Sequence, residues 1–546
     1  MYLRTTRRKN KNGTEVVYYQ LAETIYIKEK HQPQARVIHT FGRADEVDLE
    51  GLRRLAASIE RVCGAPDVET LRGTVDLEET FELGVIHVAE ALWEQLGIGP
   101  ILRRHLAKER RKVPYDRILL ALAANRLDEP CSKLGCFEHW LPVRTWLPEA
   151  AQWKFEQLYW ALDFLLAHIA AVEEELFQRV ANLFNTDVDL IFYDTTTLYF
   201  ETDEEDEEDG GLRRRGHNKE GRDGNPQVVV GLAVTRDGLP VKSWVFPGNT
   251  GDVTTIARIR EELRGWRLNR AVLVGDAGMF SADNQALLSK GLGRYILAVP
   301  MRRIKDVREQ VLTRPGRYKP VRENLEVKEI VVGDGERRQR YILCRNLDEA
   351  ARQASHRERI LTLLEGELAS LAEAKEDHPK RACELLASKR FGRYLKEGSK
   401  GRLTIDKAKV DQEIRMDGKY VLTTNDDTLS AEDVALGYKG AMIIEGCFRR
   451  MKTTGLQARP MFHWTPARIE AHVKLCVLAL LIQRAAELRT EDTWRNLHHH
   501  LEGLKAIRYR QSGKTIVQRN RISPELKEIL TKLSVPTPDK VLRIEG

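Results

Sequence analysis

The spacing of apolar residues changes several times along the chain, and each change predicts a different kind of structure. Residues 14–27 are rich in Val, Tyr, Thr and Ile and follow Asn12-Gly13, a pair that favours a tight turn. The sequence therefore predicts a small basic β-hairpin near the N-terminus. Between about residues 77 and 184, apolar residues recur every three or four positions, as at Val85, Val88 and Leu92, which predicts a helical domain.

The middle of the chain predicts a mixed sheet. Residues 190–193, 227–235 and 239–246 are apolar runs of strand length, and Asp237-Gly238 favours a hairpin between the last two. Helix and strand signals then alternate, with a helix at 252–266 capped by Asp252, a strand at 271–274, a helix capped by Ser281 and a strand at 294–299. This is the order of a ribonuclease H-like sheet, so we expect an α/β core of that type.

The same patterns divide the chain into six segments and predict a multidomain α+β protein. Residues 301–418 mix short strand runs with a charged helical stretch and interrupt the core, which predicts a β-rich insertion domain. The expected segments are an N-terminal hairpin and linker (1–75), a helical domain (76–186) whose basic turn Arg103 to Lys112 faces either DNA or solvent, the α/β core in two parts (187–300 and 419–485), the insertion (301–418) and a basic helical C-terminal region (486–546).

Composition restricts the class of protein further. The longest apolar run, Leu475 to Ile482, is far shorter than the roughly 18 residues that cross a membrane, so we expect a soluble, unsecreted protein. Seven cysteines are scattered without a framework spacing, which is typical of a reducing cytoplasm. Cys131, Cys136 and His139 could be metal ligands, but the absence of a second ligand cluster favours ordinary core cysteines.

Positive charge is concentrated at the two ends of the chain. Residues 1–43 hold nine Lys and Arg against three Asp and Glu, and residues 446–546 hold 19 against nine, so the net charge of +7 leaves the middle at −9. This asymmetry indicates terminal segments that bind nucleic acid, although a solvated, charge-mixed surface would have the same composition. Glu201 to Asp209 is an acidic run that is either a solvated loop or a shield for Arg213-Arg214-Arg215.

Two aspartates follow apolar strand residues in the core. Asp194 ends the run Ile191-Phe192-Tyr193, and Asp276 follows Val272-Leu273-Val274-Gly275. Because burying an isolated carboxylate is very costly, these two either share a cation or stand at strand ends in water. Hard oxygen ligands of this kind select Mg²⁺ or Mn²⁺, which can activate water and stabilise the leaving oxygen of a phosphodiester.

A third carboxylate lies on a helix that begins at Ser430, where Ser430 and Asp433 form a capping-box pattern. Helical periodicity over 431–454 places Tyr438, Glu445, Arg449 and Lys452 on one stripe beside an apolar stripe. The stripe is either part of an active site or a surface ion-pair ladder, in which Glu445 pairs with the basic residues that follow it.

The combined pattern resembles the DDE transposases of bacterial insertion sequences, of the IS-four type. Their signature stands here as Tyr438-x6-Glu445-x6-Lys452 within YKGAMIIEGCFRRMK. The stretches YDTTTLYFE around Asp194, VLVGDAGMF around Asp276, residues 216–255 and residues 459–482 are similar to other blocks of that family. One position departs from the signature: Ala441 stands where the family has an arginine, and Arg449 or Arg450 would then take over its role.

The resemblance implies a function for each of these residues. Asp194, Asp276 and Glu445 would bind two divalent ions, Mg²⁺ or Mn²⁺, that catalyse cleavage of transposon ends and joining of the 3′-OH to target DNA. Tyr438, Arg449 and Lys452 would hold phosphates, and His217, Lys219 and Arg222 would touch the scissile strand unless they only form a solvated loop. The partners would be the terminal inverted repeats and target DNA, bound by a homodimer on the nucleoid in the cytoplasm.

Two other functions fit the same fold. One is a nonspecific metal-dependent nuclease, and the other is a catalytically silent, sequence-specific DNA-binding protein. The intact acidic triad argues against the silent protein, and the basic ends and the long insertion argue against a minimal nuclease. His472, inside an apolar helix, is expected to be a core histidine, and His498-His499-His500 is expected to lie on the surface.

Overall fold

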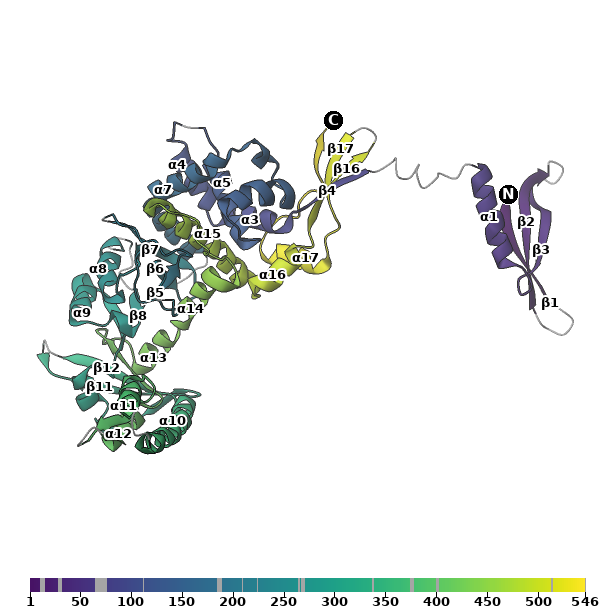
Figure 1. The fold of residues 1–546 in the computed structure, drawn as a ribbon. Helices are drawn as coiled ribbons and strands as arrows, with labels where there is room; N and C mark the ends of the chain where they lie inside the picture. Colours follow the sequence, from purple (N-terminus) through teal and green to yellow (C-terminus); the bar gives the residue numbers. More distant parts are fainter. Residues whose placement is uncertain are drawn as a thin grey trace. The chain divides into compact units, whose positions relative to one another are not determined.

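The computed structural model describes residues 1–9, 15–27, 32–63, 76–110, 112–183, 189–208, 210–222, 224–263, 266, 271–335, 338–373, 378–398, 402–511 and 514–545 (Figure 1). They form two compact units. The first holds Met1–Glu78, Arg508–Ile516 and Ile544–Gly546, and the second holds Glu79–Ile507 and Val517–Arg543.

The N-terminal segment is a three-stranded antiparallel sheet followed by a helix. Strands β1 (Tyr2–Lys9), β2 (Glu15–Ile27) and β3 (Gln32–Arg43) lie in that order, with the Val-, Tyr- and Ile-rich β2 in the centre. Helix α1 (Leu49–Cys63) begins where the Asp48 carboxylate accepts a hydrogen bond from the Gly51 amide at 2.8 Å. The sequence pattern predicted only a hairpin, because β3 is too polar to stand out. Asn12-Gly13 lies outside the described residues.

The second unit is built around a nine-stranded mixed sheet. Strands β5 (Leu190–Tyr199), β6 (Gln227–Thr235) and β7 (Pro240–Pro247) are antiparallel, and β8 (Val272–Gly275) and β9 (Arg294–Val299) continue the sheet parallel to β5. The resulting order β7-β6-β5-β8-β9 confirms the ribonuclease H-like core. Helices α8 (Asp252–Glu262) and α9 (Ala282–Ser289) connect these strands.

The strands of the insertion (301–418) extend the core sheet. Beyond β9, strand β15 (Lys419–Thr424) pairs antiparallel, followed by β12 (Gln339–Arg345), β11 (Leu325–Val332) and β10 (Lys319–Arg322). The rest is largely helical, with α10 (Leu347–Glu373), α11 (His378–Ala387), α12 (Lys407–Met416) and the short pair β13 (Leu395–Glu397) and β14 (Leu403–Ile405). These elements have their own small core, which includes Ile360, Leu364 and Leu385.

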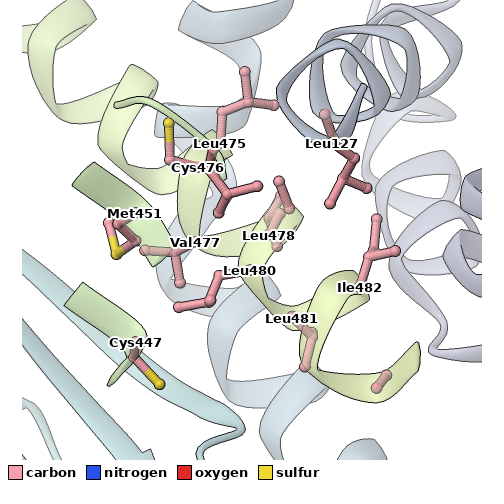
Figure 2. Packing of buried hydrophobic residues seen from close by; sticks show 14 of the residues in the cluster. Leu127, Cys447, Met451, Leu475, Cys476, Val477, Leu478, Leu480, Leu481 and Ile482 are labelled. Carbon is pink, nitrogen blue, oxygen red and sulfur yellow. The ribbon is translucent and has the colours of Figure 1, made fainter. Parts of the chain in front are cut away.

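Helices before and after the sheet in sequence pack together into one layer. They are α3 (Gly84–Gln95), α4 (Ile98–Leu106), α5 (Tyr115–Leu127), α7 (Phe155–Leu183) and α15 (Pro466–Thr490). Residues Leu475 to Ile482 of α15 are buried around the helix, and Figure 2 shows them beside Leu127 of α5 and Cys447 and Met451. In the described part of the chain, no helix combines the length and apolarity needed to span a bilayer.

The predicted helix 431–454 is divided into three pieces. Helix α13 (Ala431–Lys439) begins with the predicted capping box, in which Ser430 and Asp433 exchange hydrogen bonds. Helix α14 (Met442–Arg449) follows a break at Gly440, where an added Cβ would lie 2.8 Å from the Phe192 ring, and the π-helical turn η10 (Arg450–Thr454) completes the segment. The break and the wider turn change the phase of the predicted stripe.

The C-terminal region contains strands as well as the expected helices. Helices α16 (Trp494–Leu501) and α17 (Pro524–Lys532) alternate with β16 (Lys505–Gln511), β17 (Lys514–Arg519) and β18 (Val541–Glu545). The sheet order is β18-β17-β16-β4, where β4 is Asp76–Glu82. A purely helical tail was therefore wrong; the Ile, Val and Tyr of residues 505–519 suit strands.

Candidate active site

Two adjacent parallel strands bring the predicted aspartates together. Pairing of β5 with β8 sets Phe192 opposite Val274, so Asp194 and Asp276, each two residues further on, stand at the same level. Asp194 remains 25% exposed within an otherwise buried strand, and Asp276 is exposed just after β8. The sheet therefore presents both carboxylates at one opening.

Glu445 lines the same pocket from helix α14. The pocket also contains Asp194, Asp276, Tyr420 and Tyr438. The Tyr438 hydroxyl donates a hydrogen bond to Asp276 Oδ1 at 3.3 Å, which orients that carboxylate. The predicted triad thus faces one cavity, although no three Asp, Glu, His or Cys side chains among the described residues form a closed metal cluster as they stand.

The electrostatics of Asp194 indicate a site that favours a cation. The pKa of Asp194 is raised to about 6, mainly by burial and to a smaller extent by the nearby carboxylates of Asp276 and Asp252, while Lys219 and the Thr195 amide oppose the rise. Oxygen donors that carry excess negative charge in a partly buried pocket are the ligands that Mg²⁺ and Mn²⁺ prefer. The donor set therefore fits a hard divalent ion.

Asp252 is an acidic residue of this site that the sequence pattern assigned to helix capping. The N-cap position is Gly251, and Asp252 is the first residue of α8, with its carboxylate turned toward β5. It accepts a hydrogen bond from the Thr195 hydroxyl, and its Oδ2 lies 3.2 Å from Lys219 Nζ. Its position within the family-like block 216–255 was the only sequence signal that could have marked it.

The loop at 216–222 reaches into the acidic pocket through Lys219. Its ammonium donates to the Thr195 carbonyl and hydroxyl oxygens at 2.9 and 2.8 Å and lies 3.9 Å from Asp194 Oδ1. Arg222 stacks over the Tyr199 ring at 4.9 Å. Asn218 is buried and donates to the Gln227 side chain at 2.8 Å, so it supports the loop. The loop is therefore ordered by specific contacts, and His217 also makes contacts of its own.

Lys452 pairs with this loop and not with Glu445. Its Nζ donates to Glu220 Oε1 at 2.6 Å, and Arg459 approaches Glu220 Oε2 at 2.6 Å. Burial lowers the pKa of Lys452, and the hydrogen bond to Glu220 partly offsets this effect. The surface ion-pair ladder that was one reading of the stripe is therefore not formed at Lys452.

Arg449 and Arg450 lie at a different pocket, which is also lined by Asp128, Glu487 and His498. Arg450 NH2 is 3.1 Å from Glu487 Oε2 on α15, so it anchors the helix layer. Neither arginine lines the pocket of the three acids. The π-helical turn that begins at Arg450 separates Arg449 from Lys452, which the regular periodicity could not anticipate.

Several other sequence expectations meet specific contacts. His472 is a buried core residue, with Nε2 3.1 Å from the Ala458 carbonyl oxygen. Contrary to the expectation from the sequence, His498 does not simply face solvent, because its Nε2 lies 3.1 Å from Asp128 Oδ1. In the acidic run, Asp206 pairs with Arg213 at 2.6 Å, as the shielding interpretation requires; Asp209 lies outside the described residues.

Cys136 is a core residue in the structure, and Cys131 is half-buried beside the core. Cys136 is fully buried, and burial raises the pKa of its thiol to about 12, so it stays protonated. Cys131 contacts the Asn125 side chain. No metal group of three ligands occurs around them within the described ranges.

Comparison with protein families identifies the class. Residues 189–482, more than half of the chain, match the family described as a transposase DDE domain. The chain therefore belongs to the DDE transposases, enzymes that cleave DNA and transfer its strands. Residues 3–70 match the N-terminal domain of IS1634 family transposases, which makes this a transposase of a bacterial insertion sequence. The narrower IS-four assignment is not confirmed.

A solved structure gives a weaker likeness. The piggyBac transposase synaptic complex with hairpin DNA is 8% identical over 76% of this chain and 79% of that chain, with a TM-score of 0.35. At that score the likeness supports no argument about the site. No curated protein matches the chain.

Proposed function

We propose that Asp194, Asp276 and Glu445 are the catalytic carboxylates of this transposase. The observation that carries the proposal is the level placement of Asp194 and Asp276 on adjacent strands, with Glu445 lining the same pocket. The three would hold divalent ions, two Mg²⁺ or Mn²⁺. Such ions, when bound, activate the attacking hydroxyl and stabilise the 3′ oxygen that leaves.

The remaining residues of the pocket prepare it for that chemistry. The Tyr438 hydroxyl orients the Asp276 carboxylate. We therefore assign Tyr438 to the positioning of this carboxylate, in preference to the phosphate contact that the resemblance implied. Lys219 places a positive charge between Asp194 and Asp252, which limits the repulsion among the acids while the site holds no ion. Asp194 is ionised above its pKa of about 6, as a metal ligand must be.

DNA would be held by the basic residues around this pocket. Lys452 would contact the backbone close to the acids, and His217, Lys219 and Arg222 lie on the neighbouring loop. Arg449 and Arg450 would act further away, at the second pocket. Residues 1–75, with the basic strands β1 to β3, would bind the terminal inverted repeats. A homodimer would pair two ends and join them to target DNA on the nucleoid.

The test is a set of charge-neutral substitutions with a matched control. Asp194→Asn, Asp276→Asn and Glu445→Gln should each lower cleavage and joining of a labelled terminal-repeat duplex in Mg²⁺ by on the order of a thousandfold. Affinity for the duplex should change by less than about threefold, because the basic surface is intact. Asp189→Asn, an exposed aspartate paired with Arg236 just before β5, should leave cleavage unchanged.

Each alternative function has its own outcome in this assay. A silent DNA-binding protein would bind the repeat but leave it uncut, and a nonspecific nuclease would cut unrelated duplexes equally well. Near-normal cleavage by any one of the three acidic variants would remove that residue from the catalytic set.

A further inference from the structure

Adjacent residues of one loop place opposite charges on the two sides of the active site. Lys219 lies among the carboxylates of Asp194 and Asp252, and Glu220 lies between Lys452 and Arg459. The first contact brings a cation to the acidic side. The second contact brings an anion to the basic side, where a DNA phosphate would be expected beside the acids.

The Glu220 contact has the properties of an anion-binding site. Its two oxygens each face one cation, at 2.6 Å from Lys452 Nζ and 2.6 Å from Arg459 NH1. The cations are largely buried, with side chains 10% and 16% exposed, whereas Glu220 is 26% exposed. Arg459 is further held by stacking over the Tyr199 ring at 4.5 Å. The cationic pair is therefore more deeply buried than the carboxylate, which comes from the loop at 216–222.

Two largely buried cations require an anion when the carboxylate leaves. A phosphodiester carries one negative charge on two oxygens, as a carboxylate does, and both Lys and Arg bind it well. Arg459 begins the family-like block 459–482 but received no role from the sequence, because it lies ten residues beyond the end of α14 in an irregular segment. The turn that follows η10 brings Arg459 to the same carboxylate as Lys452.

We propose that Lys452 and Arg459 form a binding site for one DNA backbone phosphate, and that Glu220 occupies this site in the DNA-free enzyme. DNA must then displace Glu220, which lowers the apparent affinity. This inference rests on the proposed function, because that function requires DNA beside the acids. The competing interpretation is that Glu220 is a permanent strut that stays paired with Lys452 in the DNA complex.

Duplex binding by fluorescence anisotropy separates these interpretations. Without divalent ions, Glu220→Gln should bind the terminal-repeat duplex about three- to tenfold more tightly than the wild type, because the phosphate no longer competes with a carboxylate. Glu261→Gln, at an exposed position on α8, makes the same change in net charge and is the matched control. The enhancement must be measured against this control.

Salt dependence tests the phosphate contact itself. Lys452→Ala and Arg459→Ala should each weaken binding and lower the slope of log affinity against log salt by about 0.9, as expected for one lost phosphate contact. Glu220→Gln should leave the salt slope unchanged. The gain in affinity that it causes should largely vanish when Lys452 is also replaced by Ala. Because Glu220→Gln could destabilise the loop, thermal melts accompany it, and Glu220→Asp, which is too short to reach both cations, should also tighten binding.

The outcomes distinguish this inference from the proposed function. If Glu220→Gln and Glu220→Asp bind no more tightly than Glu261→Gln, the displacement is refuted, even where the three acidic variants have lost cleavage. If the acidic variants still cleave, the proposed catalytic set fails, whatever Glu220 does to affinity.

Discussion

Buried charges join the helix layer to the catalytic sheet, and their removal should be strongly destabilising. Lys474 of α15 donates to Glu173 Oε1 of α7 at 2.8 Å and to the Ser243 carbonyl oxygen of β7. The side chains of Lys474 and Glu173 are only 4% and 7% exposed. Lys242, also buried, lies 3.8 Å from the other Glu173 oxygen. Glu173 thus lies between two lysines, Lys474 and Lys242. Lys242 also pairs with a second carboxylate, Glu262, at 3.2 Å.

The consequence of each substitution follows from the charge it leaves behind. Glu173→Gln keeps the shape but leaves the Lys474 ammonium buried without a counter-ion, which should cost about 3–5 kcal/mol of unfolding free energy. Lys474→Met leaves Glu173 with Lys242 and the Ser243 hydroxyl and amide, so it should cost less, about 1–3 kcal/mol. Replacing both with apolar residues, as in Glu173→Leu with Lys474→Met, removes the buried pair together and should cost less than Glu173→Gln alone.

Thermal and urea unfolding of the four proteins would measure this coupling. A loss of 3–5 kcal/mol should lower the melting temperature by about 6–20 °C, because one kcal/mol corresponds to about 2–4 °C in a domain of 150–250 residues. With Glu173→Leu added as the matching single variant, the double-mutant cycle of Glu173→Leu and Lys474→Met should give a coupling free energy well above 1 kcal/mol. The reasoning is refuted if Glu173→Gln melts within about 1 °C of the wild type, or if the double variant is the least stable of the set.

Two further predictions concern pH and the N-terminal segment. The hydrogen bond to Asp128 raises the pKa of His498 above its ordinary value, so this pair stabilises the fold fully below about pH 6.5, and the contribution is lost as pH rises through the raised pKa. Urea midpoints at pH 5.5 and 9 should therefore differ more for the wild type than for His498→Gln, and equal differences would contradict the assignment. Deleting residues 1–75 should weaken binding to the terminal repeat more than it slows joining of a pre-nicked end, and an unchanged salt slope in gel shifts would show that the segment makes no phosphate contacts.

The sequence predicted the parts of the fold that depend on local pattern. Alternating apolar runs and the Asp237-Gly238 turn identified the strands of the core, and their order was enough to define the ribonuclease H-like sheet. The capping box at Ser430 was correct to the residue. Strand β3 and strands β16 to β18 were missed because their exposed faces are polar and basic, so period-two alternation is weak there.

The candidate site was predictable where residues lie on or directly after core strands and less so where they depend on tertiary contacts. Asp276 follows β8 as expected, whereas Asp194 lies inside β5, which continues to Tyr199. Asp194 and Asp276 could be paired from sequence because parallel neighbours place equivalent positions at one level. Arg449 and Lys452 could not be separated, because an ideal helix keeps them on one stripe. The observed segment widens into a π-helical turn after Arg449, which changes the direction of Lys452 relative to Arg449.

The pair Lys219-Glu220 shows why charge pattern alone leaves a loop undecided. In the sequence the two neighbours cancel, so the loop is equally compatible with solvation and with DNA contact. In the fold, Lys219 lies beside Asp194 in the middle of β5 and Glu220 lies beside Lys452 in the turn after α14, so each charge meets a partner of opposite sign. Lys219 and Glu220 cancel in a net-charge count. In the structure, Lys219 is matched by Asp194 and Asp252, and Glu220 is matched by Lys452 and Arg459. Net charge therefore underestimates how strongly this site is polarised, with carboxylates on one side and buried cations on the other, and that polarity is what a metal-bound phosphodiester requires.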